Sequence, residues 1–146
     1  MFRGRFEHTI DSKGRVSIPA KFREILAEKS DGRLMVTNFD RCLMAFPLDE
    51  WQVWEEKITS MSMVKKEAAA FQRFFLSGAQ ECVIDKLGRI LLPPTLRNYG
   101  QLEKNVVFVG LGKRFEIWSK ERWDEELRRS QENFEGMREV LAGLGI

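Results

Sequence analysis

An internal repeat limits the folds open to this chain more than any other feature of its sequence. Residues 10–23 and 84–97 are identical at six of 14 aligned positions, and at four more positions they pair one apolar residue with another. About one identity is expected by chance at ordinary residue frequencies. The similarity resumes with a slightly different offset, where Leu34–Val36 matches Val106–Phe108. The chain therefore contains two copies of one module.

The repeat also predicts how the chain is divided. We expect a first module over residues 5–52, a helical linker over residues 53–79, a second module over residues 80–124 and a C-terminal helix over residues 125–146. Each module alone has too little apolar material to close a core. We therefore expect the two copies to interlock about a pseudo-two-fold axis into one closed sheet.

Short strands and tight turns are predicted at the start of each module. Apolar and polar residues alternate over residues 6–10 and again over residues 16–18, which predicts a β-hairpin around the turn at residues 11–14. Asp11 opens this turn through side-chain bonds to backbone N–H groups, and Gly14 takes the positive-φ position. Pro19 and its counterpart Pro93 then end a strand and suit the start of a short helix.

Further along, the pattern predicts a second hairpin and three helices. The hairpin joins Leu34–Asn38 to Cys42–Phe46 through a turn at residues 39–41. Core-facing helical spacing follows at Trp51, Trp54 and Ile58, and then at Val64, Ala68, Phe71 and Phe75. An apolar seam from Trp123 to Leu144 is either a helix packed on the body or a contact surface for another subunit. The fold class is α+β and mainly β, with flanking helices.

Several classes of protein are excluded by composition. No apolar run is long enough to cross a bilayer, and the first residues lack the apolar block of a secretory signal, so we expect a cytoplasmic protein. Cys42 and Cys82 form no metal-binding pair and are interpreted as reduced, buried thiols. His8 lies in an alternating strand pattern and is interpreted as a structural residue. We expect no metal, no cofactor and no small-molecule substrate.

Positive charge is concentrated at the start of the chain, which points to DNA. Residues 1–23 hold six basic and two acidic side chains, although the net charge of the whole chain is only +2. An arginine beside a glycine at the end of a rigid hairpin presents a planar fork of donors to guanine or phosphate. The candidate DNA-binding residues are Lys13, Gly14 and Arg15 in the first copy and Lys86 and Arg89 in the second.

Other basic residues are expected to bind phosphate, and a structural interpretation stays open. Arg3, Arg5 and Lys21 would position the protein on the DNA backbone without reading its sequence, but they fit a solvated surface equally well. Arg15 could instead pair only with a carboxylate. The first hairpin is the better candidate, because Leu87 occupies the place of Lys13 in the second copy.

Three stretches of the sequence together resemble the MraZ family of bacterial transcriptional regulators, whose modules belong to the SpoVT-AbrB group. These stretches are the opening Phe2–Arg15, the segment Phe74–Ala79 before the second copy, and the repeated Asp-x-x-Gly-Arg motif. The resemblance covers nearly the whole chain.

This resemblance implies a swapped-hairpin, AbrB-like barrel, assembly of subunits into a homo-oligomeric ring, and association with the nucleoid. It implies regulation of the division and cell-wall gene cluster through short promoter repeats in double-stranded DNA. The DNA-contacting motif falls on residues 11–15, with Arg15 as the main contact and Asp11 as its orienting partner. Asp85 and Arg89 are the matching pair in the second copy.

Three alternatives compete with a DNA-binding regulator. A ring-forming scaffold would use the Asp–Arg pairs to lock modules or subunits together, with no specific DNA site. An enzyme would use Asp11 and Asp85 as a carboxylate pair, but the chain has no nucleophile–base motif, phosphate loop or metal cluster, so we expect none. An antitoxin of the same superfamily would require a disordered toxin-binding tail, which the duplicated module does not provide.

Overall fold

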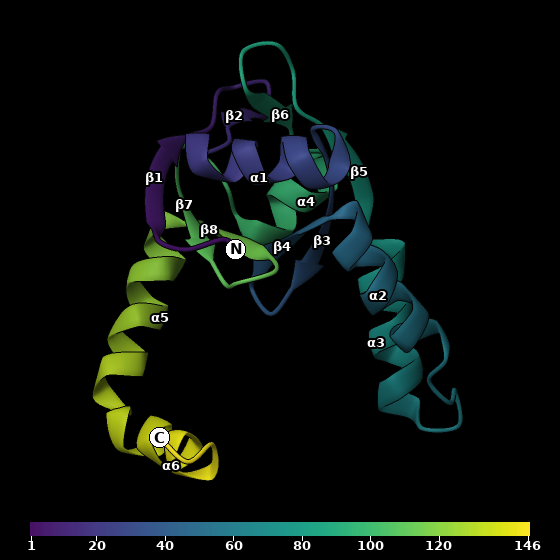
Figure 1. Cartoon of the computed structure of the whole chain (residues 1–146), viewed down its shortest axis with the longest axis vertical. Helices are drawn as coiled ribbons and strands as arrows, with labels where there is room; N and C mark the ends of the chain where they lie inside the picture. The colour runs from purple at the N-terminus through teal and green to yellow at the C-terminus, as the bar shows by residue number, and fades with distance from the viewer.

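The computed structural model describes all 146 residues and contains eight strands and six helices, and these follow the same order in the two halves of the chain (Figure 1). The elements of the first half are β1 (Arg5–Thr9), β2 (Arg15–Ser17), α1 (Ala20–Ser30), β3 (Arg33–Phe39), β4 (Cys42–Pro47), α2 (Leu48–Thr59) and α3 (Lys66–Ser77). Those of the second half are β5 (Gln80–Val83), β6 (Arg89–Leu91), α4 (Pro94–Gly100), β7 (Asn105–Gly110), β8 (Phe115–Ser119), α5 (Lys120–Glu132) and α6 (Phe134–Gly143). The order β-β-α-β-β-α thus occurs twice.

The two modules are interlocked by antiparallel strand pairs that obey a pseudo-two-fold symmetry. Strand β1 pairs with β7, and the equivalent strand β5 pairs with β3. Strand β2 pairs with its own counterpart β6, centred on Val16 opposite Ile90. Strand β4 pairs with its counterpart β8, centred on Met44 opposite Glu116. The predicted interlocking of two copies is confirmed.

A closed barrel is not found. The main sheet has six strands in the order β1-β7-β8-β4-β3-β5, which leaves β1 and β5 as edges, while β2 and β6 form a separate two-stranded ribbon. The first two strands also form less of a hairpin than predicted, because a single bridge, Ile10–Val16, joins them. Each second strand turns away to the other module: Ile18 N–H donates to Gly88 O, and Leu92 N–H donates to Gly14 O.

The second hairpin, β3–β4, forms as predicted but with a tighter turn. Phe39 and Cys42 are paired, so only Asp40 and Arg41 remain in the loop. Both have positive φ, 42° and 73°, as a two-residue type I′ turn requires.

Apolar residues from both modules share one core. Phe2 packs edge-on against Phe22 at 5.1 Å between ring centroids, and both rings contact Phe115 of the second module. All three side chains are fully buried. Burying aromatic rings of both modules together couples the stability of the two halves, so they form a single folding unit.

Two helical arms extend from the end of the molecule opposite the β2–β6 ribbon, one formed by α2 and α3 and the other by α5 and α6 (Figure 1). Helix α3 is tied to the sheet where Thr37 Oγ1 donates to Phe75 O at 2.7 Å. Val64 was expected on the inward face of α3 but precedes this helix and is 91% exposed.

The C-terminal segment was expected as one helix but divides at Asn133 into α5 and α6, neither of which contains a buried residue. No helix is long and apolar enough to span a membrane.

Candidate nucleic-acid interface

Each module presents an arginine that is held by an aspartate four residues earlier. Asp11 Oδ1 accepts the N–H groups of Lys13 at 3.0 Å and Arg15 at 2.8 Å, and Asp11 Oδ2 accepts Arg15 Nε at 3.1 Å. The bond to Nε leaves both terminal nitrogens of Arg15 without a protein acceptor. The side chain is 34% exposed, so this fork of donors faces solvent.

The second module repeats this arrangement. Asp85 Oδ1 accepts the N–H groups of Leu87 and Arg89, both at 2.9 Å, and Asp85 Oδ2 accepts Arg89 Nε at 3.1 Å. The Arg89 side chain is 29% exposed. We call each of these pairs, Asp11–Arg15 and Asp85–Arg89, an Asp–Arg clip. The two clips match bond for bond, although their turns differ in sequence.

Hydrogen bonds keep the aspartate of each clip ionised. The N–H of Arg15 is the main cause that lowers the pKa of Asp11, and the N–H of Arg89 does the same for Asp85. The guanidinium groups and the second turn N–H groups lower both pKa values further. Burial opposes these effects in both cases but does not outweigh them. Both clips are therefore ion pairs at neutral pH.

The β2–β6 ribbon places the two arginines on one surface. Arg15 lies opposite Leu91, and Arg89 lies opposite Ser17. Because paired residues of antiparallel strands share a face, these four side chains lie on the same side of the ribbon. Val16 and its partner Ile90 are buried on the other side. Figure 1 shows the ribbon and its two turns at one end of the molecule.

The last arginine of each repeated motif, Arg23 or Arg97, supports the ribbon through a hydrogen bond to the backbone at its end. Arg23 Nη1 donates to Ile18 O at 3.1 Å, and its counterpart Arg97 donates through Nε to Leu92 O at 3.0 Å. Both acceptors directly follow the strands of the ribbon. Arg23 and Arg97 therefore fix the ends of the ribbon.

The remaining predicted residues divide into two groups. Lys13, Lys86 and Lys21 are exposed, the first two in the ribbon turns and the third in the first turn of α1. Arg5 lies on β1 with its guanidinium 5.3 Å from the ring centre of Trp123 in α5. Arg3 precedes β1, beside Gly110. The structure thus keeps Arg3 and Arg5 at the end of β1 away from the ribbon turn.

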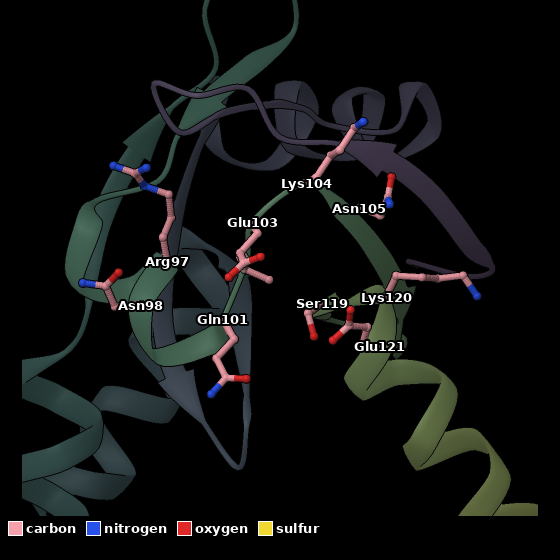
Figure 2. Close-up of a pocket in the computed structure, with 10 residues that line it drawn as sticks. Arg97, Asn98, Gln101, Glu103, Lys104, Asn105, Ser119, Lys120 and Glu121 are labelled. Carbon is pink, nitrogen blue, oxygen red and sulfur yellow. The ribbon is translucent and has the colours of Figure 1, made fainter.

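Lys104 is an exposed basic residue near the first clip that the sequence interpretation missed. Its carbonyl oxygen accepts the N–H of Ile10, at the base of the first turn, and Figure 2 shows its side chain pointing out of a cavity. The equivalent position in the first module is Gly32, whose carbonyl accepts the N–H of Ile84. The repeat alignment alone could not reveal Lys104, because the matching residue has no side chain.

The cavity of Figure 2, about 450 Å³, is polar and mixed in charge. It lies between the end of α4 and the start of α5, and its lining includes Arg97, Glu103, Lys120 and Glu121. Arg97 already supports the ribbon, and Lys120 forms an ion pair with Asp124. The lining therefore offers no concentrated charge of one sign.

The two cysteines and the single histidine lie in surroundings that fit a structural role. No group of three or more His, Cys, Asp or Glu side chains could hold a metal ion. Burial raises the pKa of Cys82 to about 11 and also raises the pKa of Cys42. His8 packs edge-on against Phe108 at 5.4 Å, and burial and the charge of Arg23 lower its pKa. Both thiols and the imidazole are thus neutral at pH 7.

Comparison with known proteins gives one consistent family. A family model with the description "MraZ protein, putative antitoxin-like" matches residues 1–74 and again residues 75–142. The proteins named Transcriptional regulator MraZ of Caldanaerobacter subterraneus subsp. tengcongensis and of Natranaerobius thermophilus are 50% and 47% identical to this chain. Another of this name, from a Thermoanaerobacter species, is 49% identical. Each alignment covers 146 residues, the full length of both chains.

Proposed function

Because the chain belongs to the MraZ family, we propose that it is a sequence-specific DNA-binding transcriptional regulator that reads DNA with its β2–β6 ribbon. The observation that carries this proposal is the pair of matching Asp–Arg clips on one exposed surface of that ribbon. The relatives that align with this chain over their full length are named as transcriptional regulators and not as enzymes, which fits this function.

The geometry of the ribbon suits the major groove of DNA. That groove admits a two-stranded β-ribbon, and an arginine fork makes two hydrogen bonds to O6 and N7 of guanine. Arg15 and Arg89 have both terminal nitrogens free for these acceptors, while the bond from Nε to aspartate fixes the plane of each guanidinium. Such preorganisation lowers the entropy lost on binding. Asp11 and Asp85 thus orient the two arginines.

Basic residues around the clips supply the contacts to phosphate. Lys13 and Lys86 are exposed in the two turns, Lys21 is exposed on α1, and Lys104 lies at the base of the first turn. Phosphate contacts add affinity without sequence preference and make binding depend on salt. Arg3 and Arg5 would reach DNA only where it extends along β1. We therefore assign these two residues a smaller contribution to the affinity for DNA.

The family resemblance supports a proposal for the target and for the assembly. We propose that the protein acts in the cytoplasm on the nucleoid, at short repeats in the promoter of the division and cell-wall gene cluster. Several identical ribbons in a homo-oligomeric ring would bind neighbouring repeats together and raise the effective affinity. Exposed apolar residues on α6, among them Phe134, Val140 and Leu141, are available for contacts between subunits.

A ring-forming scaffold without a DNA site is the second candidate, and the exposed arms favour it as far as assembly is concerned. The two functions differ in what the clips do. In a scaffold the clips would hold modules or subunits together, whereas here each clip lies within one turn of one module. This local geometry favours the DNA-binding function.

Fluorescence anisotropy tests the proposed function. The purified protein is titrated against a labelled duplex from upstream of its own coding sequence and against a scrambled duplex of equal composition, at moderate salt. We expect tighter binding to the upstream duplex, because specific sites bind far more tightly than non-specific DNA. Equal binding to both duplexes would refute sequence-specific recognition and leave the scaffold function.

A further inference from the structure

The outer face of the β2–β6 ribbon is symmetric in its arginines but not in their neighbours. Arg15 lies opposite Leu91, whereas Arg89 lies opposite Ser17. Leu91 and Ser17 occupy equivalent positions in the two modules, 74 residues apart like the two arginines. One half of the face therefore pairs an arginine with an apolar side chain, and the other half pairs an arginine with a hydroxyl.

Leu91 contributes little to the core. It is 57% exposed, although the neighbouring residues Ile90 and Leu92 are buried almost completely. Exposure to water does not stabilise an apolar side chain that lies opposite an arginine on the outer face of the ribbon. Such a side chain becomes favourable when the surface is covered by a partner that presents an apolar group at that point.

The only apolar group on the base edges of the major groove is the 5-methyl group of thymine. Side chains that face each other across an antiparallel ribbon have Cβ atoms about 4.5–5.5 Å apart, and successive base pairs are about 3.4 Å apart. Arg15 and Leu91 therefore reach the same base pair or adjacent ones. We propose that Leu91 contacts the methyl group of a thymine beside the base that Arg15 reads, an inference that rests on the proposed function.

This contact would give the protein direction on its site. The half of the ribbon with Arg15 and Leu91 favours a guanine next to a thymine, while the half with Arg89 and Ser17 reads a guanine without that requirement. A pseudo-symmetric ribbon thus recognises an asymmetric sequence. Such a reader suits sites repeated in the same orientation and not palindromes, whose two halves are equivalent.

Replacing thymine by uracil removes the methyl group alone and tests the contact directly. The upstream duplex is prepared once with thymine and once with uracil at every thymine position, and the affinities of the wild type and of Leu91→Ser are measured by anisotropy. The variant carries the residue found at the equivalent position, Ser17. The matched control is Leu111→Ser, which changes a leucine that is 40% exposed and lies beyond the end of β7. Light scattering of all proteins reports their assembly.

We expect the wild type and Leu111→Ser to bind the uracil duplex about fourfold more weakly for each methyl group contacted. Leu91→Ser is expected to bind both duplexes equally, because the side chain proposed to contact the methyl group is absent from this variant. A wild type that prefers its upstream duplex over the scrambled one but ignores the methyl groups would overturn the contact and leave the proposed function intact. A Leu91→Ser protein that keeps the methyl dependence would also overturn the contact. A change in the oligomeric mass of this variant would do the same, because it would identify Leu91 as a subunit contact. A wild type without preference for its upstream duplex would overturn the function and the contact together.

Discussion

Gly14 lies directly against the side chain of Arg97, a residue of the other module. A Cβ atom at Gly14 would stand 2.6 Å from Arg97 Nε and 2.7 Å from Cζ. The same relationship recurs between Gly88 and Arg23, where the Cβ atom would collide with Nη1 and stand 2.9 Å from Cζ. Glycine in each turn therefore has two roles, since it adopts a positive φ and leaves space for the arginine that supports the ribbon.

Substitution of Gly14 by alanine should destabilise the protein more than the same change at Gly32. Both glycines have positive φ, 92° and 75°, so alanine costs about 1–2 kcal/mol of backbone strain at either position. Only Gly14 has a side chain in the way, because a Cβ at Gly32 meets nothing within 4 Å. Overpacking adds about 1–3 kcal/mol at Gly14. Urea unfolding measures both variants.

A double-mutant cycle identifies the cause of that excess. Adding Arg97→Ala to Gly14→Ala removes the crowding, so the double variant should be more stable than the sum of the two single effects predicts. Additive effects, or equal losses at Gly14 and Gly32, would show that Arg97 does not constrain Gly14.

Replacement of Arg15 by alanine should remove most of the preference for the upstream duplex. One bidentate arginine–guanine pair is worth about 1–3 kcal/mol, so we expect specific binding to weaken about 10- to 100-fold. Binding to scrambled DNA should change much less. The fold should persist, because Arg15 bonds only within its own turn.

Lys66→Ala provides the matched control for Arg15, because Lys66 is an exposed cation in the arm opposite the ribbon. Its binding is expected to equal that of the wild type in anisotropy titrations. If Arg15→Ala keeps full preference, or if its oligomeric mass falls in light scattering, the clip is structural.

The sequence predicts the parts of this site that depend on local rules. The Asp11 turn, the positive φ of Gly14 and the helix after Pro19 all follow from neighbouring residues, and all are found. The partner of β2 does not follow in this way, because three residues with a single buried side chain fit a hairpin with β1 as well as a ribbon with β6. Hydrogen bonds between modules decide the pairing, and they also place Leu91 opposite Arg15.

The pH dependence of stability should reveal the two clips. The pKa values of Asp11 and Asp85 are lowered by folding, so their stabilisation is complete above the ordinary value of 3.8 and disappears as the pH falls through the lowered values. Asp11→Asn/Asp85→Asn should therefore unfold at a lower temperature than the wild type at pH 7. The gap between the two proteins should stay constant down to about pH 5 and narrow below about pH 4. Calorimetry at each pH checks this, and a gap that already narrows between pH 7 and pH 5 would assign it to other groups.

Replacement of Lys104 by alanine should weaken binding to every DNA sequence by a similar factor. A phosphate contact carries no sequence information, and its loss reduces the slope of log affinity against log salt by about 1. Anisotropy titrations at several salt concentrations, with the upstream and the scrambled duplex, measure this slope. A loss confined to the upstream duplex would instead identify Lys104 as a base contact.

The C-terminal arm should control assembly independently of the fold. Phe134 and Leu141 are seven residues apart on α6, are 49% and 38% exposed, and have no partner in the body of the subunit. Because α6 contains no fully buried residue and both side chains are exposed, Phe134→Ser/Leu141→Ser should leave the temperature of subunit unfolding nearly unchanged while lowering the oligomeric mass measured by light scattering. Glu139→Ala, on the same helix, should change neither the unfolding temperature nor the oligomeric mass.

Since a smaller assembly engages fewer repeats at once, the double variant should also bind a duplex with several repeats more weakly while its affinity for a single repeat stays the same. An unchanged mass would place the subunit contact elsewhere, and a loss of affinity for the single repeat would mean that the arm affects the ribbon itself.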